Sequence, residues 1–344
     1  MDLTFILPTY NRKNYVLRAI NSCLLINKKS KRIKVKVLVL DGFSKDGAWE
    51  LMQSTYLKNS NVILKQFSKS LGFQETAFLG LKYVKTDYCT FMYNDDVISN
   101  YYHKFAEKLE DSDQNFIMGY GKNFDVSQTY KFHKPNFVMV RPQDVVLNYF
   151  GFFNKLKYNS LPVSPVPSIS KTSNLKLWKN QVREFTSKSS FRKILMLNKN
   201  IGPDLVILLF NLVLQKQNFF ICNSTISQLS THPSAMSIAY GKTPLSTGYW
   251  LARIWYFEYY LVNCKNIDKI FLSKISSYII VGGFYILILN MLSFNFYYSK
   301  NIFYEIWTIS KKNFHKKIVG MTLYYILEII LNRLKRKKMF YTPK

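Results

Sequence analysis

Residues 88–96 read YCTFMYNDD, an apolar run that passes directly into two carboxylates. The run is short and aromatic, which predicts a buried strand over residues 88–93, with Asp95 and Asp96 just past its carboxyl end. Neighbouring like charges repel, so a buried edge keeps both carboxylates ionised only if a cation lies beside them. The alternative is an Asp that caps the helix expected near Asn100, and a bare Asp-Asp pair favours that interpretation. The strands and loops around this pair favour the cation site over the helix cap.

The chain on both sides of this segment alternates strand and helix patterns. We expect further strands at residues 3–7, 34–40, 62–66 and 116–124, separated by helices at residues 13–26, 45–57 and 74–84. Strands that alternate with helices of 10–15 residues predict βαβ units and a mostly parallel sheet. The first 120 residues therefore predict an α/β fold.

Polar and acidic residues follow three of these strands. The segments are residues 8–12 (PTYNR), 41–47 (DGFSKDG) and 94–96 (NDD). The carboxyl ends of parallel strands meet at one edge of a sheet, and ligands of such folds bind there. The residues alone therefore predict a binding site at this edge.

The region from residue 150 to residue 200 is less regular. Pro162, Pro165 and Pro167 predict a stiff loop, because each fixes a backbone torsion angle and lacks an N–H. Residues 201–204 (IGPD) then open an apolar helix with a proline in its first turn, and a short strand is expected at residues 219–222.

The composition changes from about residue 241. Residues 275–299 carry no charged side chain and are long enough to span a bilayer at ~1.5 Å per residue, although a buried helix of a helical subdomain is the alternative. Residues 318–331 are again apolar, and residues 333–338 contain five basic side chains. Polybasic segments are attracted to anionic lipid surfaces, so this region predicts membrane association.

The whole chain carries a formal net charge of +28. Nucleic acid, an anionic membrane surface and phosphate-bearing substrates are the partners that such a charge favours. The four cysteines form no C-x-x-C pair, so zinc is not expected. No basic and apolar leader is recognisable at the N-terminus, and we expect a cytoplasmic protein with reduced cysteines.

Four motifs in about the first 100 residues resemble glycosyltransferase family 2. Residues 5–12 (FILPTYNR) are similar to the family's opening strand and loop, and residues 40–47 (LDGFSKDG) to its Asp-Gly-Ser-x-Asp-Gly loop with one residue inserted or the Ser displaced. Residues 71–81 resemble its glycine-containing helix entry, and residues 94–96 stand at its metal-binding position. Each motif is weak alone, but their order and spacing are specific. One departure is Leu40, because the family often has a second acid before the glycine.

The resemblance implies a GT-A fold, a Rossmann-like sheet that binds a nucleotide diphosphate at its carboxyl edge. Carried over to this chain, Thr9 and Tyr10 would line the nucleobase pocket. Asp41 would bind the base or the ribose, and Asp95 would contact the ribose and the metal side. Arg12 is a candidate phosphate contact by its charge alone.

The resemblance also implies a divalent cation, Mn²⁺ or Mg²⁺, with Asp96 as its ligand. His232 is placed to help, although a lone His is more often structural. The family's general base is an Asp or Glu at the start of a later helix, and Asp204 fits that position. The alternative for Asp204 is that it only complements the positive end of its helix.

The resemblance therefore implies an inverting transferase in cell-surface polysaccharide synthesis, with Asp204 taking the proton of an acceptor hydroxyl. The expected partners are a nucleotide-diphosphate sugar donor, a glycan or lipid-linked acceptor and an anionic membrane surface at the inner face of the cell membrane, and not nucleic acid. We expect residues 1–240 to form the transferase domain, with a nucleotide-sugar half (1–120) and an acceptor half (121–240). Residues 241–344 would form a helical, membrane-associating extension.

Two other functions compete with this prediction. A sugar-phosphate nucleotidyltransferase shares the sheet and the metal, but it would normally have a glycine-rich phosphate loop after the first strand, and residues 8–12 contain no glycine. A non-enzymatic protein that binds nucleic acid or membranes would explain the charge. It should show a basic face with stacking aromatics in a recognisable module, which the sequence does not contain.

Overall fold

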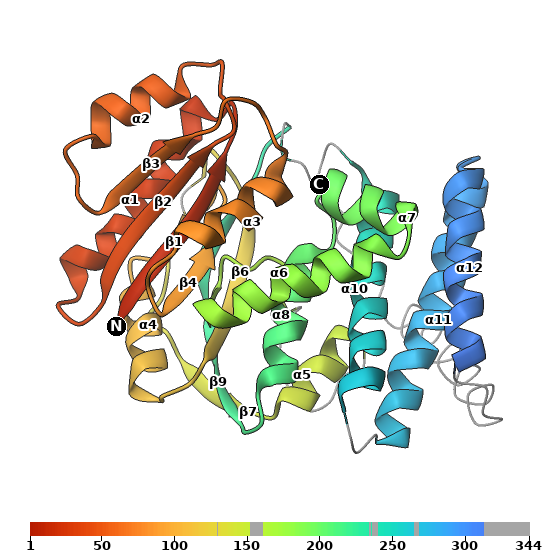
Figure 1. Cartoon of the computed structure of the whole chain (residues 1–344). Coiled ribbons are helices and arrows are strands. Elements are labelled where there is room, and N and C mark those ends of the chain that lie inside the picture. The colour runs from red at the N-terminus through yellow and green to blue at the C-terminus, as the bar shows by residue number, and fades with distance from the viewer. Residues whose placement is uncertain (129, 152–160, 234, 236–239, 265–267, 313–344) are drawn as a thin grey trace.

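A computed structural model gives the structure of residues 1–128, 130–151, 161–233, 235, 240–264 and 268–312. The N-terminal strands and their helices lie at one end of the molecule, and the last helices, α11 and α12, stand at the opposite end (Figure 1). The predicted segments at residues 318–331 and 333–338 lie outside the described residues.

One mixed sheet runs through the described part of the chain. Its strand order is β3-β2-β1-β4-β8-β6-β9-β5, and β7 pairs with β9. The first four strands along this order are parallel, and β8 is antiparallel to both of its neighbours. The strands are β1 (Asp2–Thr9), β2 (Lys34–Asp41), β3 (Val62–Gln66), β4 (Tyr88–Phe91), β5 (Val97–Ile98), β6 (Phe116–Asp125), β7 (Phe137–Val140), β8 (Ser168–Lys171) and β9 (Phe219–Thr231).

The helices cover both faces of the sheet and continue beyond it (Figure 1). The βαβ pattern predicted for the first 120 residues is confirmed, with element ends within a few residues of the expected ones. The helices of this half are α1 (Lys13–Lys29), α2 (Ala48–Tyr56), α3 (Phe73–Tyr83) and α4 (Tyr102–Asp111). The later helices are α5 (Pro142–Tyr149), α6 (Thr172–Ser187), α7 (Ser190–Lys193) with the π-helical turn η1 (Ile194–Asn198), α8 (Pro203–Leu214), α10 (Lys242–Asn263), α11 (Lys269–Leu292) and α12 (Phe296–Lys312).

Alternate side chains of the central strand β1 enter two separate apolar cores. Phe5 and Leu7 pack with residues of α1 and α4 on one face, whereas Ile6 packs with residues of α3, α6 and α8 on the other. This alternation follows from the two-residue period of a strand. The second core continues through α10, α11 and α12, so the C-terminal helices share apolar packing with the sheet.

Helix α3 lies unusually close to the sheet at Gly80. A Cβ atom at this position would stand 2.6 Å from Leu40 Cδ1 and 2.7 Å from Ile6 Cγ2. The last glycine of the motif at residues 71–81 is therefore explained by packing, because only a residue without a side chain allows this approach.

Strand β9 corrects the short strand expected at residues 219–222. It runs for 13 residues, from Phe219 to Thr231. The polar residues after Cys222 hide it in the sequence, but the backbone of β9 is satisfied by pairing with β5, β6 and β7. A strand whose backbone N–H and C=O groups are paired with neighbouring strands is stable without an alternating apolar pattern in its sequence.

The uncharged segment 275–299 is not one continuous helix, which corrects the single span considered from the sequence. Helix α11 ends at Leu292, the chain turns with Phe294 at φ 54°, and α12 begins at Phe296. Asn295 accounts for the new start, because its side-chain oxygen accepts from the N–H of Tyr298 at 3.3 Å. Helix α11 by itself is long and apolar enough to cross a bilayer, and 44% of its most apolar stretch is buried inside the protein.

A buried ion-pair cluster fastens α12 to the rest of the fold. The guanidinium of Arg192 contacts Glu305 of α12 at 2.6 Å and Glu258 of α10 at 3.0 Å, and the Arg192 and Glu305 side chains are each 5% exposed. A buried charge without its partner is strongly destabilising. The position of α12 is therefore fixed against α7 and α10.

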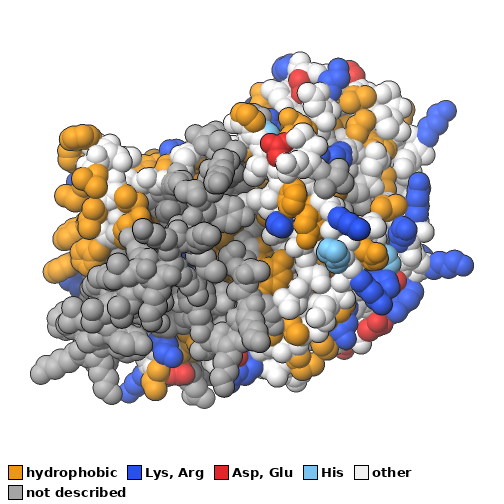
Figure 2. Space-filling view, turned by 180° about the vertical axis from the view of Figure 1, so that it is seen from behind, with side chains coloured by type: hydrophobic (Ala, Val, Ile, Leu, Met, Phe, Trp, Pro, Cys, Tyr) orange, Lys and Arg blue, Asp and Glu red, His pale blue; other side chains and the backbone are white. Residues whose placement is uncertain are grey.

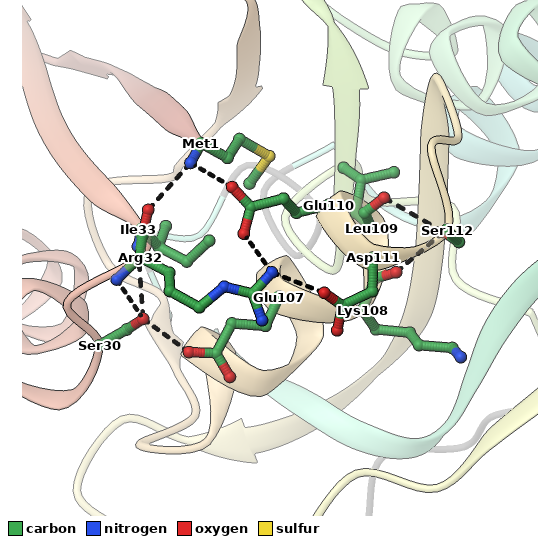
Figure 3. A network of polar contacts seen from close by, with 10 residues as sticks. All are labelled: Met1, Ser30, Arg32, Ile33, Glu107, Lys108, Leu109, Glu110, Asp111 and Ser112. Atoms are coloured by element: carbon green, nitrogen blue, oxygen red, sulfur yellow. Dashed lines mark hydrogen bonds and ion pairs between the residues drawn. The ribbon is translucent and has the colours of Figure 1, made fainter.

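A second polar network lies at the amino end of the strands (Figure 3). The amino group of Met1 contacts Glu110 of α4 and the carbonyl oxygen of Arg32 at 2.9 Å, and Arg32 bridges Glu110 and Asp111. These contacts join β1 and the loop before β2 to α4. The exposed pair of Arg32 and Asp111 adds little stability, about 0–1 kcal/mol.

We predict that Gly80→Ala lowers the free energy of unfolding by about 1–3 kcal/mol, because the added methyl group overlaps Leu40 and Ile6. Chemical denaturation measures the change. Gly282→Ala in α11 is the matched control, since its Cβ would find only an ordinary contact of 3.6 Å with Trp250. The control should be neutral or stabilising by up to about 1 kcal/mol, as for any Gly to Ala change inside a helix. Equal effects of the two substitutions would contradict the close approach.

Candidate active site

The carboxyl ends of β1, β2 and β4 bring three predicted loops together. Asn11 connects the first two of them, because its N–H donates to Ser44 Oγ at 2.9 Å and its side-chain oxygen accepts from the N–H of Lys45 at 2.7 Å. Asn94 connects the third, since its amide donates to the carbonyl oxygen of Pro8 at 3.2 Å. The predicted edge is therefore a continuous surface.

Asp41 is fully buried at the end of β2. Its carboxylate accepts from the N–H of Ser44 at 3.0 Å, from the Ser44 hydroxyl and from the Gln66 amide at 2.9 Å. These contacts hold the loop in one conformation and leave room for one more hydrogen bond to a carboxylate with about four lone-pair sites.

The other residues of the first loop differ in exposure. Thr9 is buried beside the Asn94 amide, and Tyr10 is 47% exposed. Arg12 precedes α1, and its guanidinium donates to the carbonyl oxygen of Asn11 at 3.2 Å. Thr9, Tyr10 and Arg12 thus lie along one edge with Asp41, as the sequence predicts.

The two carboxylates after β4 point to different partners. Asp95 Oδ2 lies 2.8 Å from Nε2 of His232, whose ring stacks on Tyr15 with centroids 4.9 Å apart. Asp96 is 4% exposed, and its Oδ1 accepts from the N–H of Ser230 at 2.8 Å. The end of β9 therefore meets the end of β4 and brings His232 to the predicted carboxylate pair.

The side chain of Arg18, in α1, connects the residues at this junction of β4 and β9 through hydrogen bonds. Its guanidinium donates to the carbonyl oxygen of Asp95 at 2.7 Å, to the carbonyl oxygen of Val126 at 2.8 Å and to Ser230 Oγ at 2.9 Å. One side chain thus joins the loop of Asp95, the turn at Val126 and the end of β9, and it places a positive charge next to the carboxylates.

Asp204, at the start of α8, lies near Tyr93 and Asp96. The hydroxyl of Tyr93 is buried without a hydrogen bond of normal geometry and interacts with this carboxylate. Burial raises the pKa of Asp204 to about 7, and Tyr93 acts in the opposite direction. Tyr249 of α10 also faces Asp204, whose negative charge adds to burial in raising the pKa of the Tyr249 hydroxyl.

Two glycines allow α10 to reach this position. Gly202 has φ +103°, and a Cβ there would lie 2.4 Å from the carbonyl oxygen of Gly248. A Cβ at Gly248 would in turn lie 2.3 Å from Ile201 Cγ2. The backbones of α10 and of the loop before Asp204 therefore touch, which places the neighbouring Tyr249 at the site.

The site contains more negative than positive charge. Burial, followed by the charge of Asp95, raises the pKa of Asp96 well above its ordinary value, and Asp204 acts in the same direction against the Ser230 N–H and Arg18. Among the residues that the structure describes, no three His, Cys, Asp or Glu side chains form a complete metal site. Asp95 and His232, 2.8 Å apart, could supply two ligands to a cation that takes its remaining ligands from phosphate oxygens and water.

Several residues of the site carry no signal in the sequence. Arg18 stands in the middle of a helix, 77 residues before Asp95. Tyr93 and Tyr249 read as apolar residues of a strand and a helix, and Ser230 acts through its backbone. Only the arrangement of the strands and of α10 shows that they meet.

Comparisons with known proteins agree with this arrangement. Residues 4–173 match the family described as Glycosyl transferase family 2. The abequosyltransferase RfbV of Salmonella typhimurium is 28% identical over 101 residues, which is 29% of this chain and 29% of that protein, so the match spans less than a third of its length.

Two solved structures are similar in fold. TarS 1–349 of S. aureus in complex with UDP-GlcNAc has a TM-score of 0.55 at 16% identity and covers 83% of this chain and 73% of its own. A longer TarS structure has a TM-score of 0.54 at 15% identity and covers 83% of this chain and 44% of its own. The predicted GT-A fold is therefore confirmed.

We predict that Asp204→Asn stabilises the protein at pH 8 by roughly 1–4 kcal/mol and does not stabilise it at pH 4. The folded-state pKa of about 7 lies above the ordinary 3.8, so folding favours the protonated acid. The wild type therefore loses stability as the pH rises from about 4 to about 7, and the variant does not. Denaturant unfolding at several pH values measures the difference.

Asp144→Asn is the matched control for this experiment. Asp144 lies in the first turn of α5, another helix that begins with proline, and its carboxylate contacts Arg141 at 2.8 Å. An acid that only complements the positive end of a helix stabilises the folded protein. Asp144→Asn should therefore lower the free energy of unfolding by about 0.3–1 kcal/mol. A loss of stability at pH 8 in Asp204→Asn would assign Asp204 to the same structural role.

Proposed function

We propose that this protein is an inverting glycosyltransferase. The premise is that the chain belongs to glycosyl transferase family 2 through residues 4–173. The protein moves a sugar from a nucleotide-diphosphate donor to a glycan or lipid-linked acceptor in cell-surface polysaccharide synthesis. The observation that carries this proposal is the convergence of Asp95, Asp96 and Asp204 at the carboxyl edge of parallel strands. A relative that is an abequosyltransferase, and a fold shared with TarS bound to UDP-GlcNAc, support a UDP-sugar or a similar donor.

The donor nucleotide is assigned to the first two loops. Asp41 is buried and held rigidly, so its remaining lone pair suits a base or ribose donor group. Tyr10 presents an exposed ring beside buried Thr9, which suits the face of a nucleobase. Arg12 contributes a positive charge at the start of α1 for the phosphates, and Asp95 borders the ribose.

A divalent cation, Mn²⁺ or Mg²⁺, would be held by Asp96 and His232. Such an ion neutralises the charge that the leaving diphosphate gains. The excess of carboxylates at the site supports this assignment, because buried acids are stabilised by a nearby cation. Arg18 positions the loop that carries both acids through its contact with the Asp95 carbonyl oxygen.

The reaction is a single displacement at the anomeric carbon. Asp204 accepts the proton of the acceptor hydroxyl, and the hydroxyl oxygen forms a bond to the anomeric carbon. The bond from that carbon to the diphosphate oxygen breaks on the opposite face, and the electron pair leaves with the nucleotide diphosphate. A pKa near 7 suits a base that works at neutral pH.

A panel of nucleotide sugars in a thermal-shift experiment, with and without Mn²⁺, tests the proposed donor site. At one hundred times its dissociation constant a donor stabilises the fold by ~2.7 kcal/mol. We expect one nucleotide class to raise the melting temperature, and to do so more strongly with Mn²⁺. Asp96→Asn should retain the fold and lose the Mn²⁺ dependence. If no nucleotide sugar shifts the wild type, the proposed function is wrong.

We further predict that Asp204→Asn lowers kcat by about 10²–10⁴-fold and leaves donor binding unchanged, because the base acts only in the transition state. In the wild type, kcat/KM should rise with pH and level off above about 7, the pKa of Asp204. Initial rates of nucleotide release measure both effects. Retention of full activity by Asp204→Asn would assign the proton transfer to another group.

The acceptor side is proposed to lie at the inner face of the cell membrane. The outer faces of α11 and α12 expose an apolar and aromatic surface, the hairpin face, which consists of Phe284, Tyr285, Ile288, Met291, Leu292, Phe294, Phe296, Tyr297, Phe303, Tyr304 and Trp307. Apolar side chains line the edge of the molecule where this hairpin stands, away from the part of that view where basic side chains gather (Figure 2). Aromatic side chains favour the interface between lipid and water. Because the buried Arg192–Glu305 pair fixes α12, we assign the hairpin to lying on the membrane and not to crossing it.

We predict that replacing Phe284, Phe303 and Trp307 together by serine weakens binding to vesicles with anionic lipid by at least about tenfold, since each buried aromatic contributes roughly 1.5–3 kcal/mol. Co-sedimentation with vesicles measures the binding. Leu57, Ile63 and Leu177 are exposed apolar residues elsewhere, and the same three serine changes there should have no effect. Equal binding by both variants would contradict an interfacial hairpin face.

A further inference from the structure

Three aromatic rings form a ladder at the surface beside the candidate active site. The rings of Phe124 and Tyr130 have centroids 5.0 Å apart at 62°, and those of Tyr130 and Phe132 lie 5.1 Å apart at 78°. All three side chains are half-buried and belong neither to the apolar cores nor to the hairpin face. Part of the surface of each ring is therefore accessible to a ligand and is not covered by packing inside the protein.

Basic side chains border this ladder. Lys122 Nζ stands 5.3 Å from the Phe124 centroid and 5.4 Å from the Tyr130 centroid. Lys131, His133 and Lys134 follow on the same segment, and all four basic residues are exposed. We call Lys122, Phe124, Tyr130 and Phe132 the aromatic platform. Its neighbourhood is positive, which suits an anionic partner.

Hydrogen bonds hold residues 125–128 and Tyr130, between the two sides of the platform. Asp125 accepts from the N–H of Ser127 at 2.9 Å, and its carbonyl oxygen accepts from the N–H of Gln128 at 2.9 Å. The buried Gln228 of β9 donates to the carbonyl oxygen of Gln128 at 2.9 Å and accepts from the N–H of Tyr130 at 3.3 Å. A surface that is fixed before binding loses little entropy when a ligand arrives.

The same segment is joined directly to the catalytic edge. Val126 donates its N–H to the carbonyl oxygen of Thr231 at 3.1 Å, and its own carbonyl oxygen accepts from Arg18 at 2.8 Å. Phe124 pairs in the sheet with Ser230, whose N–H binds Asp96. The aromatic platform therefore begins where the carboxylate site ends.

We propose that the aromatic platform binds the acceptor, and that the acceptor is a glycan that carries phosphate or carboxylate groups. Sugar rings present C–H faces that pack on aromatic rings, and Lys122 supplies a charge-assisted contact to an anionic substituent. The inference rests on the proposed glycosyltransferase function and names its acceptor class. The platform adjoins the edge that holds Asp96, because Phe124 pairs with Ser230.

Calorimetric titration of the full chain tests this proposal with three probes of similar length. These are oligogalacturonate, a phosphorylated maltoheptaose and the neutral maltoheptaose. We expect the two anionic probes to bind the wild type at least about tenfold more tightly than maltoheptaose. Tyr130→Ala and Lys122→Gln should each weaken their binding by about tenfold. Both variants should keep the nucleotide-sugar thermal shift of the wild type.

A second lysine–aromatic pair provides the matched control. Lys65 Nζ stands 4.4 Å from the centroid of the exposed Tyr83, on β3 and α3. Tyr83→Ala and Lys65→Gln remove the same ring and the same charge, and should leave binding of the probes unchanged. Equal losses in the two pairs, or no preference for the anionic probes, would overturn the proposal. A protein that binds these probes but no nucleotide sugar would refute the proposed function and not the platform.

Discussion

The burial of acids at the carboxyl edge of the sheet is the constraint on which the rest of the site depends, because Asp96 and Asp204 are both buried there and Asp95 adds its charge beside Asp96. Burial raises the pKa of Asp96 and of Asp204, so the fold without ligands does not favour the ionised forms. A cation and a diphosphate would supply the charges and oxygen ligands that this edge lacks.

The surrounding fold limits how far these acids can separate. Arg18 holds the loops of Asp95, Val126 and Ser230 with one guanidinium. The contact between Gly202 and Gly248 brings α10 and its Tyr249 to Asp204. Because α10 also joins the ion cluster of Arg192 with α12, the hairpin face and the carboxyl edge of the sheet belong to one packed body. A surface at the hairpin would thus have a fixed orientation relative to the site.

Local patterns predicted the first half of the fold well, because each βαβ element is short and its apolar residues repeat with the period of a strand or a helix. Asp41, Asp95 and Asp96 could be singled out for the same reason, since Asp41 ends β2 and the two other acids lie a few residues after β4. Strand β9 was underestimated because its polar residues are satisfied by neighbouring strands far away in the sequence. Arg18 and Tyr249 could not be found, since their roles depend on contacts with other elements. Asn295 is visible as a polar interruption of the uncharged segment, but one polar residue among apolar ones does not by itself show that a helix ends and a new one begins there.

The most direct test of the central claim follows the anomeric proton by NMR during turnover of the nucleotide sugar that binds best, with Mn²⁺ present. If Asp204 deprotonates an acceptor that attacks opposite the diphosphate, an α-linked donor must first yield a product, or a hydrolysed sugar, with β configuration. The account predicts that β signal, and predicts its loss in Asp204→Asn. An α product as the first species, or a donor that is bound but never consumed, would contradict the account.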